Sequence, residues 1–220
     1  MSKQFWGVIV VIVLIFVGVV AIGGKSGNSS KNGSKTSSSQ PTNHVIGNGS
    51  TGVKLVEYGD YQCPYCEEYS SIVKDVQTEY NDKIYFQFRN FPLTSLHPNA
   101  FAAARAAEAA GLQGKFWQMH DTLYLNSNWQ DWTNARDPNT LFEQYATSLG
   151  LNITKFKQDF ASTQVNDMIN ADMNEGNKLN ITGTPTFFID GKQVTITADK
   201  ADFEKVINAA IASKSANSNQ

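Results

Sequence analysis

The sequence Tyr61-Gln62-Cys63-Pro64-Tyr65-Cys66 decides how the rest of this chain is interpreted. It holds the only two cysteines among 220 residues, and two positions separate them. Thiols at this spacing can close a small disulfide ring without large backbone movement. They could equally provide half of a zinc site, which needs four ligands. The stretch therefore predicts either a redox-active pair or part of a metal centre.

Composition limits what this pair can be. The net charge is -2 and the basic residues form no dense run, so we expect no nucleic acid as a partner. A zinc site would need two further ligands from His44, His97 and His120, and no second cysteine pair exists. Packing or capping roles are expected for His97 and His120. We therefore predict no metal, and no cofactor beyond the disulfide that Cys63 and Cys66 can form.

The N-terminal part is strongly apolar and is followed by a polar stretch. Residues 5–22 carry no charge, and as a helix they would extend roughly 27 Å, close to the ~30 Å of a bilayer core. Residues 1–24 are predicted to be a membrane anchor or a cleaved signal segment, for which Val19 and Ala21 offer a small-residue cleavage context. Residues 25–52 are rich in Ser, Gly and Asn, which predicts a flexible tether.

The cysteine motif lies between two predicted strands. Residues 53–58 form an apolar run, residues 64–80 have the three-and-four spacing of a helix with one buried face, and residues 84–89 alternate as a second strand. Pro64 suits the first position of that helix, where a missing N–H costs nothing. A strand–helix–strand crossover of this kind makes a parallel pair.

The remainder reads as a helical insertion followed by a return to strands. Residues 98–179 contain four or five helices, predicted in part at 99–110, 115–125, 139–149 and 165–179. Strands follow at 185–189 and 194–197 around an Asp190-Gly191 turn, then a helix at 199–212 and a disordered tail at 214–220. The element order predicts an α/β thioredoxin fold formed by residues 53–97 and 180–213, with 98–179 as an inserted helical domain. Core or domain-interface positions are expected for three tryptophans, Trp117, Trp129 and Trp132.

Cys63 is the predicted nucleophile and Cys66 the resolving thiol. A helix N-terminus or a Cys-x-x-Cys context lowers a thiol pKa from ~8.5 to ~3.5–7. A stabilised thiolate favours the reduced form, so the disulfide becomes a stronger oxidant. The helix entrance should leave the Cys63 sulfur exposed, and Pro64 and Tyr65 should tune its environment.

Glu57 stands six residues before Cys63 in the first predicted strand. Strand alternation places it on the same face as Leu55, where a carboxylate beneath the motif could move a proton for Cys66. The alternative is a carboxylate at the strand end in water.

Several ordered motifs make residues 53–213 resemble the DsbA-like branch of the thioredoxin superfamily. They are Asp60 to Cys66, Phe91-Pro92-Leu93 followed by His97-Pro98, Gln113-Gly114-Lys115-Phe116-Trp117, and Gly183-Thr184-Pro185-Thr186-Phe187-Phe188-Ile189. The resemblance implies a thiol–disulfide oxidoreductase outside the cytoplasm. It also implies a cis peptide at Pro185, substrate contact by Thr184 and Pro185, and a buried acid at Glu57. The dipeptide here is Pro64-Tyr65, whereas the best-known members have Pro-His.

The sequence-based hypothesis is a disulfide oxidase for reduced secreted or cell-surface proteins, held at the cell membrane through residues 5–22. If residues 1–24 are cleaved, the protein would be secreted or periplasmic. The resemblance implies reoxidation by a quinone-linked membrane oxidase. Two alternatives remain: a reductase or isomerase on the same fold, and a non-catalytic tethered peptide-binding or holdase domain.

Overall fold

The structure is a computed structural model that describes residues 40–218. The predicted anchor or signal segment, including residues 5–22, lies outside this part of the chain. Within residues 40–218, no helix has both the length and the apolar character needed to cross a bilayer.

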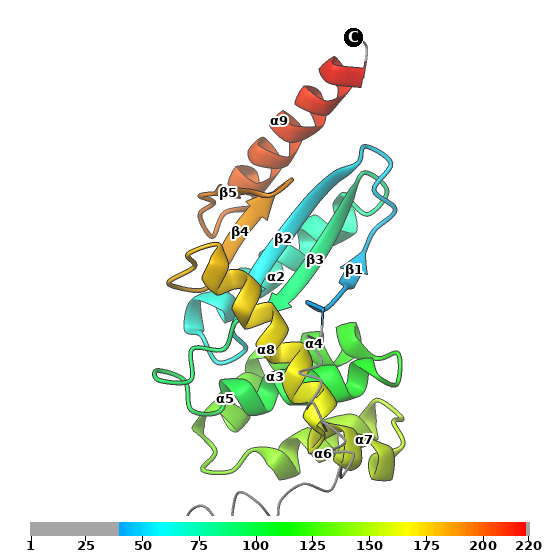
Figure 1. Cartoon of the computed structure of the whole chain (residues 1–220), viewed down its shortest axis with the longest axis vertical. Helices are drawn as coiled ribbons and strands as arrows, with labels where there is room; N and C mark the ends of the chain where they lie inside the picture. Colours follow the sequence, from blue (N-terminus) through cyan, green and yellow to red (C-terminus); the bar gives the residue numbers. More distant parts are fainter. Residues whose placement is uncertain (1–39, 219–220) are drawn as a thin grey trace, which may run out of the picture. The chain divides into compact units, whose positions relative to one another are not determined.

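A five-stranded mixed sheet forms the centre of the described chain, in the order β1-β3-β2-β4-β5 (Figure 1). The strands are β1 (His44–Ile46), β2 (Val53–Gly59), β3 (Ile84–Asn90), β4 (Thr186–Ile189) and β5 (Lys192–Val194). β2 and β3 are parallel because helix α2 (Pro64–Glu79) joins them as a crossover. The other neighbouring strands are antiparallel. The order of these elements is the one predicted for a thioredoxin fold.

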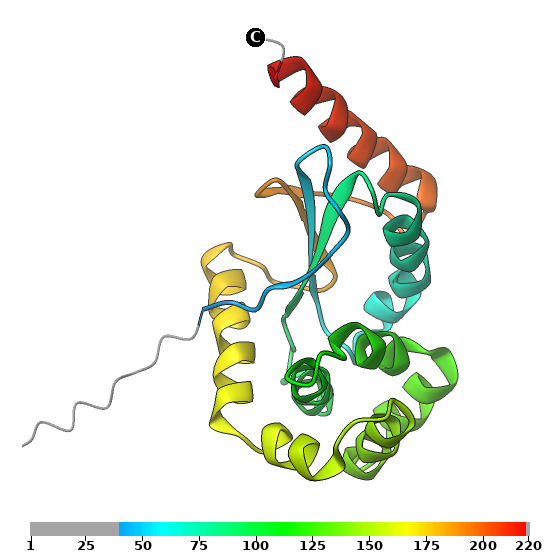
Figure 2. The same ribbon diagram turned by 90° about the vertical axis from the view of Figure 1, so that its right-hand side faces the viewer.

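Helices cover both faces of the sheet. α2 and α9 (Lys200–Ser218) pack together on one face, and α8 (Thr163–Lys178) lies on the other, as the turned view in Figure 2 shows. Because successive strand side chains point to opposite faces, Val53, Leu55 and Glu57 face the α2 layer. Val56 and Tyr58 pack with α8 through Met173. Glu57 is therefore directed into the layer that carries the cysteines.

The insertion between β3 and β4 is entirely helical apart from its connections. It comprises α3 (Ala100–Gly111), α4 (Phe116–Tyr124), α5 (Asn126–Asn134), α6 (Asn139–Ser148), α7 (Ile153–Phe160) and α8. The prediction of four or five helices was too low for the described chain, because the short α5 and α7 were not recognised. Trp132 is fully buried among these helices, and Trp117 packs against Phe86 of β3 at a ring-centre distance of 5.8 Å.

The structure corrects the predicted tether. Residues 40–52 were expected to be flexible, but β1 pairs with the edge of β3 and adds a strand to the sheet. Thr42 is 5% exposed, and both its backbone N–H and its hydroxyl donate to Asp172 on α8, at 2.7 Å each. Composition gave no sign of this segment, because the contacts that hold it join residues far apart in the sequence.

Two boundaries near the C-terminus also differ from the prediction. The Asp190-Gly191 turn is confirmed, since both residues have positive φ (48° and 79°), as a type I′ turn requires. The second strand of this hairpin is Lys192–Val194 rather than 194–197. Residues 214–218, predicted as part of a disordered tail, continue α9. There Lys214 forms an ion pair with Asp190 at 3.1 Å.

Candidate active site

Cys63 occupies the N-cap of α2, and Pro64 is the first helical residue, as predicted. The Cys63 backbone is extended (φ -72°, ψ 124°), so the chain turns into the helix directly after the first sulfur. The prediction of an exposed sulfur was wrong in degree, because Cys63 is only 4% exposed. The loop before β4 covers it, with the Cys63 Sγ 3.3 Å from the carbonyl oxygen of Thr184.

Hydrogen bonds converge on the Cys63 sulfur and favour its thiolate. The pKa of Cys63 is lowered from 9.0 to about 6, first by a hydrogen bond from the Cys66 thiol and then by hydrogen bonds involving Thr184 and the backbone N–H groups of Cys66 and Tyr65. The Thr184 hydroxyl is buried and makes no other hydrogen bond in the described structure, so it is free to donate to a thiolate. Tyr65 contributes its amide while its side chain is 66% exposed.

Cys66 lies in the opposite environment, one turn further into the helix. It is completely buried, and burial is the main cause that raises its pKa well above 9.0, followed by the hydrogen bond to Cys63. The Asp60 backbone N–H is 3.5 Å from its sulfur. Both thiols are free in this structure. At neutral pH the reduced pair therefore carries one thiolate, on Cys63, and one thiol, on Cys66.

Glu57 is a buried acid, so the alternative of a solvated carboxylate is excluded. It is 3% exposed, and no described residue gives its carboxylate a hydrogen bond or an ion pair. Burial and then the charge of Cys63 raise the pKa of Glu57 from 4.5 to about 8. A side chain at Gly59 would place its Cβ 2.4 Å from the Phe88 ring and 3.2 Å from Glu57 Oε1, so this glycine keeps the space around the acid open.

The segment before β4 completes the surroundings of Cys63. The Thr184–Pro185 peptide bond is cis, which agrees with what the resemblance implied for Pro185. The two residues predicted to contact substrate are therefore next to the nucleophilic sulfur, brought there from 121 positions away in the sequence.

Asp60 positions the motif, a role that the sequence analysis missed. Its carboxylate is fully buried and accepts hydrogen bonds from the backbone N–H of Gln62 (2.7 Å) and of Leu93 (2.8 Å), and it pairs with His97 Nδ1 at 2.7 Å. Asp at the end of a strand was the available signal in the sequence, because its side chain often accepts a hydrogen bond from the backbone N–H two residues later in an Asx turn. His97 thus has a structural role, as predicted.

Aromatic residues from the helical insertion support the motif from behind. Trp129 on α5 donates from Nε1 to the Tyr61 carbonyl at 2.8 Å, which places it at the domain interface, as predicted. His120 is buried, and its Nδ1 lies 3.1 Å from the Tyr61 hydroxyl. Burial lowers the pKa of His120 to about 3, so this side chain is neutral. Its packing role agrees with the prediction.

The three histidines have different polar partners. His44 pairs with Glu108 at 2.8 Å, His97 with Asp60, and His120 with Tyr61. Across residues 40–218, no group of three or more His, Cys, Asp or Glu side chains is arranged to hold a metal ion.

The fold and the site define the class of this protein as a thioredoxin-type dithiol protein with a helical insertion. Residues 39–209 match the family model described as Thioredoxin, and the chain therefore belongs to the thioredoxin family. The match extends over the inserted helices and includes residues 39–52, which the sequence analysis had assigned to the tether.

Two solved structures resemble this chain over most of its length. The chain is 27% identical to a thioredoxin-like oxidoreductase from Silicibacter pomeroyi DSS-3, with 78% of this chain and 93% of that chain covered and a TM-score of 0.63. It is 23% identical to alpha-DsbA1 from Wolbachia pipientis, with 81% and 96% covered and a TM-score of 0.67. Both structures share the fold of this chain, and the predicted thioredoxin superfamily and fold class are confirmed.

Curated relatives carry a different name. The chain is 33% identical over 168 residues to Na(+)/H(+) antiporter NhaA 1 of Mycolicibacterium gilvum, covering 76% of this chain and 26% of that protein. It is 37% identical over 150 residues to NhaA 1 of Salinispora arenicola, covering 68% and 22%. The chain spans about a quarter of the length of the curated relatives it matches.

Proposed function

We propose that this protein is an extracytoplasmic disulfide oxidase that introduces disulfides into reduced secreted or cell-surface proteins through Cys63 and Cys66. The observation that carries the proposal is the unequal environment of the two sulfurs. Hydrogen bonds lower the pKa of Cys63 to about 6, whereas burial raises that of Cys66. Stabilising the Cys63 thiolate stabilises the reduced pair, which makes the disulfide a stronger oxidant.

The reaction consists of two thiol–disulfide exchanges. A client thiolate attacks the Cys63 sulfur of the Cys63–Cys66 disulfide, and Cys66 leaves as a thiolate that takes up a proton. A second client thiolate then attacks the client sulfur of the mixed disulfide, and Cys63 leaves as a thiolate. The client loses two electrons and gains a disulfide, while the cysteine pair gains both electrons.

The surroundings suit each of these steps. Cys63 is a good leaving group because its thiolate already has hydrogen-bond donors. The leaving Cys66 sulfur is buried and takes up a proton readily, and Glu57, which is protonated below its pKa of about 8, can supply one. Thr184 and Pro185 form the wall of the site beside which an extended client segment can lie.

The proposed partners and location follow from the same hypothesis. Reoxidation requires an electron acceptor, for which we propose a quinone-linked membrane oxidase. Residues 5–22 would hold the protein at the cell membrane with the dithiol domain outside the cytoplasm. Protease added to intact cells should then digest the domain, and full protection of the domain would contradict this location.

The function is tested by equilibrating the full chain with glutathione redox buffers and measuring the oxidised fraction of the pair. We expect a potential well above the ~-270 mV of thioredoxin. Oxidation of a reduced, unfolded two-cysteine protein should depend on both sulfurs, so Cys63→Ser and Cys66→Ser serve as controls. A potential as reducing as that of thioredoxin would contradict the oxidase and favour the reductase.

A further inference from the structure

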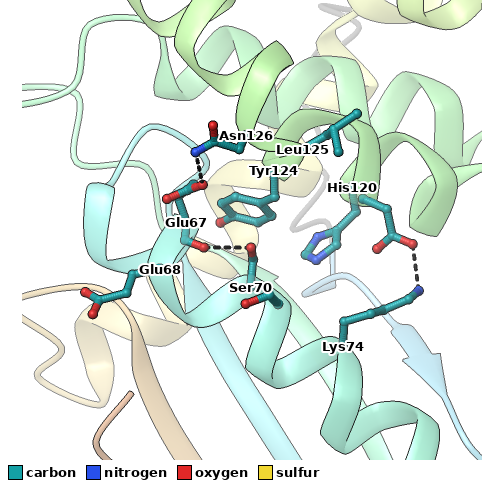
Figure 3. Close-up of a pocket in the computed structure, with 10 residues that line it drawn as sticks. Glu67, Glu68, Ser70, Lys74, His120, Tyr124, Leu125 and Asn126 are labelled. Carbon is teal, nitrogen blue, oxygen red and sulfur yellow. Dashed lines mark hydrogen bonds and ion pairs between the residues drawn. The ribbon is translucent and has the colours of Figure 1, made fainter. Parts of the chain in front are cut away.

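A surface pocket lies beside the first turns of α2, the helix that begins at the cysteine pair. It lies between α2 and the α4–α5 segment and has a volume of about 560 Å³ (Figure 3). Its outer lining is charged, with Glu67, Glu68 and Lys74 on α2 and Asp121 on α4. A polar space of this size holds several water molecules, since each takes up ~30 Å³ in the liquid.

Tyr124 on α4 stands at the inner end of this pocket. It is 6% exposed, and its hydroxyl is buried without a hydrogen-bond partner in the described structure. Figure 3 shows its ring extending from α4 towards the first turn of α2. The ring is held between Tyr61 and His120, with ring centres 5.0 and 5.1 Å away. An unpaired buried hydroxyl is costly, so its retention calls for an explanation.

Two buried groups that exchange protons in the proposed reaction act electrostatically on this hydroxyl. Apart from burial, the charges that raise the pKa of Tyr124 are those of Cys66 first and Glu57 second. Cys66 is fully buried and Glu57 is 3% exposed, so neither exchanges protons freely with bulk water. Glu57 can supply one proton per turnover and must then be reloaded. A path between the acid and the solvent is therefore required.

We propose that Tyr124 is a proton-relay residue between water in the surface pocket and the buried pair of Cys66 and Glu57. When Cys66 leaves as a thiolate, the phenol passes its proton inward and takes one from pocket water. When Cys66 must act as a nucleophile, its proton leaves by the reverse route. The proposal rests on the dithiol chemistry described under Proposed function, but it concerns the rate of proton transfer and not the direction of electron flow.

Other titratable groups around the hydroxyl do not offer this path. On the loop after β2, the Asp60 carboxylate is hydrogen-bonded to Gln62, Leu93 and His97. The Tyr61 hydroxyl is hydrogen-bonded to His120. On α4, His120 Nδ1 is bonded to the Tyr61 hydroxyl at 3.1 Å, and Asp121 is paired with Lys74 of α2 at 2.6 Å. On α2, Cys63 is already ionised at neutral pH, and Glu67 accepts a hydrogen bond from Asn126 of α5.

The test uses Tyr124→Phe, which removes only the hydroxyl. Because that hydroxyl has no partner, the variant loses no hydrogen bond and should fold normally. The reduced protein is mixed with glutathione disulfide, and release of glutathione from the Cys63 mixed disulfide is followed across the pH range. We expect release, which requires Cys66 to lose its proton, to slow by about 10-fold or more. Imidazole, a proton carrier small enough for the pocket, should restore the rate.

Tyr145→Phe is the matched control, because it also removes a tyrosine hydroxyl from the helical insertion. The Tyr145 hydroxyl, on α6, donates only a long hydrogen bond, to the Asn128 carbonyl at 3.4 Å. Ser71→Phe is a second variant, which fills the pocket from the exposed surface of α2 and should slow release without touching the hydroxyl. Release from Tyr124→Phe as fast as from Tyr145→Phe would overturn the relay, and so would slowing that imidazole does not relieve. The equilibrium with glutathione should not move, so failure of the relay and failure of the oxidase proposal give different results.

Discussion

Glu57 on β2 and Asp172 on α8 are both buried acids, but their surroundings are opposite. Asp172 is fully buried and accepts hydrogen bonds from Thr42, Asn90 and Arg89, at 2.7 to 3.2 Å. Glu57 has no such donor, and burial raises its pKa to about 8. A buried carboxylate with a full set of donors joins elements together, whereas one without donors holds its proton near neutral pH. The first arrangement stabilises the fold, and the second provides a group for proton transfer.

The largest expected loss of stability follows from removing the Asp172 carboxylate. Asp172→Ala removes the fully buried carboxylate beside Arg89, which keeps the partly exposed Glu175 at 3.2 Å. It also removes the hydrogen bonds that join Thr42 to α8. We expect a loss of about 3–5 kcal/mol in the free energy of unfolding, measured by urea denaturation. Asp131→Ala, at an exposed position of α5, is the control and should change stability by less than about 0.5 kcal/mol. Equal effects of the two variants would show that the Asp172 cluster does not hold the fold together.

Glu57 should behave in the opposite way when its charge is removed. Its folded pKa is raised, so the stabilisation it provides is complete below the unfolded value of 4.5 and is lost as pH rises towards about 8. Glu57→Gln should therefore be more stable than the parent at pH 8, by on the order of 2 kcal/mol, and should not be more stable at pH 4. The readout is urea unfolding of the reduced protein at both pH values.

Glu68→Gln provides the control for this pH effect, since Glu68 is exposed on α2. A pH-independent difference between the parent and Glu57→Gln would mean that Glu57 titrates as an ordinary carboxylate. Glu57→Gln should also slow the step in which Cys66 takes up or loses a proton.

Hydrogen-bond donors also decide the charge state of the Cys63 sulfur, as they do for the two buried acids. The expected changes in free energy are smaller here. Cys66→Ala removes the largest cause of the lowered pKa of Cys63, and Thr184→Val removes a lesser one. Both variants should raise that pKa, Thr184→Val by less than one unit because a hydrogen bond contributes roughly 1 kcal/mol. Alkylation rates of Cys63 as a function of pH measure both shifts. A larger shift from Thr184→Val than from Cys66→Ala would reverse the assigned order of causes.

Local patterns in the sequence predicted the elements that carry the chemistry. The Cys63-Pro64-Tyr65-Cys66 spacing, the proline at the start of α2 and the alternation that buries Glu57 all depend on neighbouring residues. Contacts between distant residues could not be read in this way. Thr42 and Asp172 are 130 positions apart, and nothing in a polar segment indicates that it will dock on a buried carboxylate. The helical pattern of residues 115–125 does not distinguish Tyr124 from a core aromatic, because only the packed structure shows where its hydroxyl points.

The two sulfurs of the Cys63-Pro64-Tyr65-Cys66 motif have widely separated pKa values. Titrating the thiolate absorbance of the reduced full chain tests this separation most directly, with Cys63→Ser and Cys66→Ala to assign the steps. One thiolate should appear with a midpoint near pH 6, assigned to Cys63, and no second thiolate should appear below pH 9. A single step near pH 8.5–9 that contains both thiols would contradict the separation.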